Sequence, residues 1–162
     1  MPSFQARRTA QRYCQTNLAP PEQIFPLLCP VREAEWLDGW QYRMIYSASG
    51  RVEKGCVFST RQEGEEDTLW VVTRHDPIRH EIAFARFTPR SRICVLEIAV
   101  KPAGTGRSAV HIVYTYTGIA PKGNRFIDGF TREAFLEAVR VWEQAINHCL
   151  VTGKKLKRTG KD

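Results

Sequence analysis

The stretch PEQIFPLLCPVREAEWLDGW (residues 21–40) decides the fold, because it is apolar enough to face an interior yet contains three prolines. Ile24 and Leu28 are about one turn apart and would share one face of a helix. Pro26 and Pro30 exclude one long helix, because proline lacks the amide donor that a helix interior needs. The stretch therefore predicts two short helices, joined near Pro30, that turn a corner and bury one side.

Strand patterns lie on both sides of this stretch. Residues 7–18 alternate roughly between polar and apolar side chains and predict a first strand. After residue 40 the chain is rich in β-branched and aromatic residues, interrupted by turn signals such as Asp76-Pro77. The six runs are QYRMIYSA (41–48), GCVFSTR (55–61), LWVVTRH (69–75), HEIAFARF (80–87), RICVLEIAV (92–100) and SAVHIVYTYTGIA (108–120). Consecutive strands with short connections favour an antiparallel meander.

The C-terminal part of the chain has a helical period instead. Apolar side chains recur at three- and four-residue steps from Phe130 to Cys149, and charged or amide side chains fill the positions between them. Gly153 is a typical stop signal. The spacing predicts one long amphipathic helix that covers one face of the sheet. The predicted class is α+β, with residues 1–153 as a single domain.

The positive charge is concentrated in the last residues. The formal net charge is +7, and the segment 154–162 (KKLKRTGKD) supplies five basic side chains against one acidic one. A basic terminus of this kind is typically disordered and solvated. It also leaves open a contact with nucleic acid or an anionic membrane surface, of which nucleic acid is the less favoured partner.

The cysteine pattern favours thiols over bridges or a metal centre. The five cysteines are odd in number, irregularly spaced and never form a C-x-x-C pair. Reduced, buried thiols in a cytoplasmic protein are the expectation. The N-terminal residues lack the apolar segment of a signal peptide, and no run is long enough to cross a membrane. Neither a cofactor nor a metal is predicted.

The order strand, two short helices, six strands and long helix resembles the START-related or SRPBCC superfamily, which includes polyketide cyclases and the major birch pollen allergen. The resemblance extends over about residues 7–152. The segments that carry it are IFPLLCPVREAEWLDGW (24–40), SASG with GCVFST (47–60), LWVV with the following Asp76, and VHIVYTYTGIA (110–120). The resemblance implies a helix-grip fold, in which a seven-stranded antiparallel sheet wraps around the C-terminal helix. It also implies an internal cavity whose mouth is formed by the short helices and loops.

Strand alternation predicts which side chains would line that cavity. An outward Glu97 sends its two neighbours inward, and the bulky side chains of the last strand form a second inward set. The predicted lining residues are Trp70, Val72, Arg74, Phe84, Leu96, Ile98, Ile112, Tyr114, Tyr116, Phe135 and Trp142. Arg86 shares the predicted face of Phe84. The alternative is that the aromatic side chains only pack the core and the arginine heads reach solvent.

The candidate chemistry stays open. His75, Asp76 and His80 have the residue types of an iron site, but they flank a turn and not a rigid scaffold. General acid–base groups are Tyr114, Tyr116, Arg74 and Glu97, and no spacing singles out a catalytic residue.

The leading interpretation is therefore binding of a small hydrophobic or amphipathic molecule, such as a lipid or aromatic compound, by a monomer or homodimer. A cyclase- or dehydratase-like enzyme that uses the same cavity, the tail contact described above, and a structural protein with a filled core are the alternatives.

Overall fold

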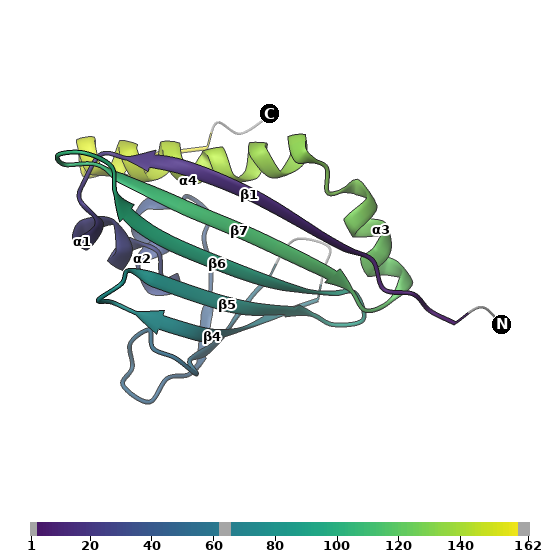
Figure 1. Ribbon diagram of the computed structural model, residues 1–162. Coiled ribbons are helices and arrows are strands. Elements are labelled where there is room, and N and C mark those ends of the chain that lie inside the picture. Colours follow the sequence, from purple (N-terminus) through teal and green to yellow (C-terminus); the bar gives the residue numbers. More distant parts are fainter. Residues whose placement is uncertain (1–2, 62–65, 159–162) are drawn as a thin grey trace.

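The computed structural model describes residues 3–61 and 66–158 and has the predicted α+β class. The seven strands form one antiparallel sheet in the order β1-β7-β6-β5-β4-β3-β2. The long helix α4 runs along this sheet, with α1 and α2 near one of its ends and α3 at the other (Figure 1). The elements are β1 (Arg8–Asn17), α1 (Pro21–Ile24), the 3-10 turn η1 (Phe25–Leu27), α2 (Pro30–Trp36), β2 (Arg43–Tyr46), β3 (Val57–Thr60), β4 (Thr68–Asp76), β5 (Glu81–Thr88), β6 (Arg92–Pro102), β7 (Ser108–Gly118), α3 (Pro121–Gly129) and α4 (Arg132–Thr152).

The proline-rich stretch forms the predicted corner. A proline stands at the first position of both α1 and α2, where its missing N–H breaks no helical hydrogen bond. Trp36 of α2 is fully buried and donates its indole N–H to the carbonyl oxygen of Leu27 in η1 at 2.9 Å, which links α2 to the turn that precedes it. The interruption therefore directs α2 toward the space between the sheet and α4.

Helix α4 ends at the predicted stop signal and begins at a threonine cap that the sequence analysis did not single out. The Thr131 hydroxyl accepts a hydrogen bond from the backbone N–H of Ala134 and caps the first turn. Gly153 ends the helix in the left-handed region at φ 68°, where glycine has no steric penalty. Phe135 and Ile146 are buried under the helix and belong to its apolar stripe.

Helix α3 is an element that the sequence pattern did not reveal. Pro121 opens it, but Gly123 and Asn124 are poor helix formers, so no helical period is visible. The helix is accommodated by a close approach, because a Cβ added to Gly123 would lie 2.6 Å from the carbonyl carbon of Ser91 and closer still to its oxygen. Glycine at this position brings α3 against the turn between β5 and β6.

The described part of the basic tail, residues 154–158, contacts the segment that follows α2, while the expectation of a disordered tail stays a prediction. Leu156 forms a bridge to Leu37, next to the C-terminal end of α2. The backbone N–H of Arg158 donates to the Asp38 carboxylate at 3.0 Å, and Lys157 pairs with the same side chain at 3.7 Å. Residues 159–162 lie outside the described part of the chain.

All five cysteines are free thiols. Cys56 and Cys94 are buried, as expected, whereas Cys29 and Cys149 are half-buried and Cys14 is exposed on β1. The expectation of buried thiols therefore holds for two of the five. Within the described residues, no helix combines the length and the apolar character that crossing a membrane requires.

Candidate ligand-binding site

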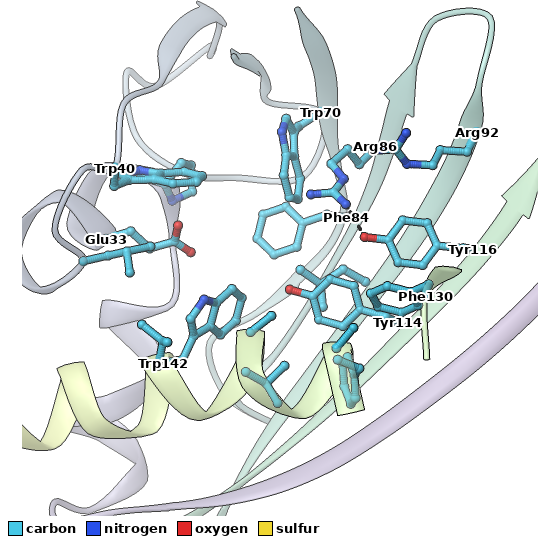
Figure 2. A pocket seen from close by; sticks show the side chains of 18 of the residues that line it. Glu33, Trp40, Trp70, Phe84, Arg86, Arg92, Tyr114, Tyr116, Phe130 and Trp142 are labelled. Atoms are coloured by element: carbon cyan, nitrogen blue, oxygen red, sulfur yellow. Dashed lines mark hydrogen bonds between the residues drawn. The ribbon is translucent and has the colours of Figure 1, made fainter. Parts of the chain in front are cut away.

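A cavity of about 510 Å³ lies between the inner face of the sheet and helix α4. About half of its lining residues are aromatic, and polar groups come from α2, β5, β6, β7 and the C-terminal segment (Figure 2). The lining residues are Pro30, Glu33, Leu37, Trp40, Phe58, Trp70, Phe84, Arg86, Arg92, Leu96, Tyr114, Tyr116, Phe126, Phe130, Ala134, Phe135, Ala138, Val139, Val141, Trp142 and Arg158.

Most of the predicted lining residues meet at this cavity. Those in its wall are Trp70, Phe84, Leu96, Tyr114, Tyr116, Phe135 and Trp142. Val72, Ile98 and Ile112 also point inward, but they are almost completely buried in the packed core beside the cavity. The alternation along β6 and β7 is therefore as predicted, while a role in binding a ligand stays a prediction for each residue.

Arg74 is the exception, because the structure places it on the outer face of the sheet. The pairing of β4 with β5 shifts between Val72 and Arg74, so that Thr73 is an extra residue in β4. Such a bulge exchanges the faces of the residues that follow it. Arg74 consequently stands opposite Ala83, forms an ion pair with Glu81 and is 54% exposed. The prediction that Arg74 points inward is wrong for this reason.

The cationic end of the cavity is formed by Arg86 and Arg92. Arg86 lies 4.8 Å from the ring centre of Trp70 and donates a hydrogen bond to the hydroxyl of Tyr116. Arg92 is 3% exposed, and its guanidinium lies 3.6 Å from the ring centre of Phe126. Both cations therefore lie against aromatic faces, which attract positive charge. The structure decides between the two interpretations of Arg86, since this side chain belongs to the cavity wall.

Two tyrosines lie side by side on β7 at the centre of the wall. Burial raises the pKa of Tyr116 to about 12 and that of Tyr114 well above its ordinary value. Both hydroxyls are therefore neutral donors near neutral pH. Tyr114 stacks on Tyr116 and packs edge-on against Phe135 at 5.6 Å. Within the described part of the chain, the Tyr114 hydroxyl makes no hydrogen bond and remains available to a ligand.

Glu33 is a site residue that the sequence reasoning missed. It lies on α2, is 7% exposed, and directs its carboxylate into the cavity between Trp40 and Trp142 (Figure 2). Burial raises its pKa from 4.5 to about 8. The signal was present, because Pro30, Glu33 and Trp36 are three residues apart and form the buried face of α2. A carboxylate at this spacing interrupts an otherwise apolar face.

The remaining chemical candidates do not meet at the cavity. Glu97 lies on the outer face of β6, as predicted, and is therefore separated from the two tyrosines. His75 and His80 instead pack on the ring of Phe25, with centroids 5.6 and 5.5 Å away. Among residues 3–61 and 66–158, no three His, Cys, Asp or Glu side chains gather as a metal site would require.

The sequence matches no family model and no curated protein. The structure, in contrast, is similar to many solved structures. Norcoclaurine synthase from Thalictrum flavum, in complex with dopamine and hydroxybenzaldehyde, has a TM-score of 0.67 and 14% identity over 94% of this chain and 91% of its own. Ara h 8.0201 has a TM-score of 0.64 and 13% identity over 90% and 99% of the two chains.

A third similar structure is the Zhui aromatase/cyclase from Streptomyces sp. R1128. Its TM-score is 0.63, with 15% identity over 93% of this chain and the whole of that chain. Identities this low establish the architecture and not the activity. The chain therefore has the helix-grip fold that the resemblance of its sequence implies.

Proposed function

We propose that the protein binds a small amphipathic molecule, with an aromatic or similarly apolar body, in the cavity between the sheet and α4. The observation that carries the proposal is a cavity of about 510 Å³ with aromatic walls and a few convergent polar groups. Ligand sites in proteins have this size and composition. Protein interiors otherwise contain few voids larger than a water molecule, so the cavity argues against the alternative of a filled core.

The polar groups indicate how such a molecule would lie. Arg86 and the Tyr116 hydroxyl can donate to an oxygen acceptor at one end, while Trp70, Tyr114 and Trp142 offer faces and edges to its body. Among the solved structures of the same fold, norcoclaurine synthase is in complex with dopamine and hydroxybenzaldehyde, which are aromatic, and another is an aromatase/cyclase. This parallel supports an aromatic ligand more than a long lipid chain.

Tryptophan fluorescence provides the test, because Trp40, Trp70 and Trp142 line the cavity and only Trp36 does not. We expect 8-anilinonaphthalene-1-sulfonate to bind with a stoichiometry of one and to change this emission. Ala138 lies on the cavity wall, whereas the adjacent Glu137 is exposed and does not line the cavity. Ala138→Phe should therefore abolish binding and Glu137→Phe should not. Equal binding by both variants would place the probe elsewhere.

A second candidate function is a cyclase- or dehydratase-like reaction in the same cavity. The observation that favours it is the carboxyl of Glu33, whose pKa of about 8 is close to the range that suits a general acid or base. Tyr116 and Arg86 would stabilise the enolate oxygen that forms when the carboxylate removes a proton next to a carbonyl. Incubation with a poly-β-ketone thioester tests this candidate. A product lighter by one water that Glu33→Gln fails to form would support it, and an unchanged substrate would exclude it for that compound.

A further inference from the structure

The carboxylate of Glu33 is buried at the cavity wall, on the inward face of α2. It points into the cavity from α2, and Figure 2 shows it across the cavity from Arg86 and Tyr116. We propose that Glu33 binds a protonated nitrogen of the ligand, so that the cavity selects an apolar or aromatic amine. This inference rests on the proposed function and names the class of molecule that the cavity would take.

The neighbouring donors are already used. Trp40 gives its indole N–H to the carbonyl oxygen of Pro30 at 2.8 Å, and Trp36 gives its own to Leu27. Within residues 3–61 and 66–158, no hydrogen bond or ion pair reaches the Glu33 side chain. A buried ionised carboxylate without a partner is costly, so the side chain stays largely protonated unless a compensating cation lies beside it.

The other charged groups around the cavity do not supply that compensation. On α2 itself, Arg32 points to solvent and pairs with Glu35 at 3.1 Å. The cations in the cavity wall are Arg86 on β5, Arg92 on β6 and Arg158 in the C-terminal segment. Strand β7 contributes Tyr114 and Tyr116, and all the lining residues of α4 are apolar. Burial is the cause of the raised pKa of Glu33, and no hydrogen bond or ion pair within the described residues joins one of these cations to its carboxylate. The Tyr114 hydroxyl is near enough to be affected by Glu33, but it is neutral.

An organic cation fits the space better than a metal ion does. A metal needs several ligands, and the described residues offer only this one carboxylate at the cavity wall. Trp40 and Trp142 lie on either side of the carboxylate in Figure 2, and indole faces attract ammonium groups. A ligand with an amine at Glu33 and an oxygen acceptor near Arg86 would contact both polar ends of the cavity at once.

Binding of an amine would be linked to protons. With a pKa of about 8, about nine in ten Glu33 side chains are protonated at pH 7. The ammonium group must displace that proton, because it pairs only with the ionised carboxylate. The affinity for an amine should therefore rise about 100-fold between pH 6 and pH 9, as long as the amine itself stays protonated.

Isothermal titration calorimetry with three matched probes tests the inference: 1-naphthylmethylamine, 1-naphthalenemethanol and 1-naphthaleneacetic acid. At pH 8.5 we expect the amine to bind at least about tenfold more tightly than the alcohol. Titrations at pH 7 in phosphate and in Tris should reveal the release of nearly one proton with the amine and none with the alcohol. Glu33→Gln should remove the preference for the amine, so that the amine and the alcohol bind with similar affinity. Glu35→Gln, on the exposed side of the same helix, is the control and should behave as the wild type.

The outcomes separate this inference from the function on which it rests. Equal affinity for amine and alcohol, tighter binding of the acid, or an unchanged amine affinity in Glu33→Gln would each overturn the role of Glu33 and leave the cavity as a binding site. If none of the three probes binds, the proposed function fails, and the inference fails with it.

Discussion

Replacement of Glu33 by glutamine should stabilise the protein, and the gain should depend on pH. The folded protein holds the Glu33 proton up to a pKa of about 8, whereas the unfolded chain releases it near 4.5. Between these values the folded state binds more protons, so the free energy of unfolding falls as the pH rises. A difference of about 3.5 between the two pKa values corresponds to about 5 kcal/mol, and about 3 kcal/mol of it is already lost at pH 7.

Urea denaturation at pH 5, 6, 7, 8 and 9 measures this effect. The free energy of unfolding of Glu33→Gln, minus that of the wild type, should increase by about 1.4 kcal/mol per pH unit up to pH 8 and then level off. Glutamine keeps the size of the side chain and cannot ionise. Glu35→Gln removes an exposed carboxylate from the same helix and should show no such slope. A difference that stays constant from pH 5 to pH 9 would show that Glu33 is hydrated or paired, and would refute the reasoning.

Three further changes test the packing around the site. Tyr114→Phe should change the free energy of unfolding in urea by no more than about 0.5 kcal/mol, since no described residue bonds its hydroxyl, but should weaken the binding of an oxygen-bearing ligand in calorimetry. Gly123→Ala should cost at least about 3 kcal/mol in urea denaturation because of the contact with Ser91, whereas Gly129→Ala, with open space around it, should be neutral or stabilising. Truncation after Gly153 removes the tail contacts with Leu37 and Asp38. We expect the free energy of unfolding to fall by about 1 kcal/mol, which lowers the melting temperature by a few degrees. An unchanged melting temperature would show that the tail contacts contribute nothing.

The inward face of the strands was predictable where the alternation of side chains is uninterrupted. Along β6, Leu96 and Ile98 are buried while Glu97 faces outward, and Ile112 and Tyr116 are the buried residues of β7. The period of two residues is a property of the extended backbone, so a single well-placed charge is enough to fix the face of a whole strand. The apolar stripe of α4 was predictable in the same way, because its three- and four-residue spacing is a property of the helical backbone.

Features that depend on contacts between distant segments were not predictable in this way. The bulge at Thr73 moves Arg74 to the outer face, and no residue type marks it in the sequence. Helix α3 exists because Gly123 permits a close approach to Ser91, which is a property of the folded chain and not of a helical period. The docked tail likewise depends on Asp38, more than a hundred residues away in the sequence.

Glu33 belongs to a third category, in which the sequence contains the signal but its meaning depends on the cavity. The prolines begin α2 at Pro30, and this starting point places Glu33 on the same side as Trp36. If the space in front of that face were filled, natural packing would favour an apolar residue at position 33. The space instead forms part of a cavity with cationic groups across it, and the proposed binding of an amine would account for a carboxylate at this position. The broken helix at residues 21–40 is thus both a corner in the chain and the element that brings an ionisable group to the site.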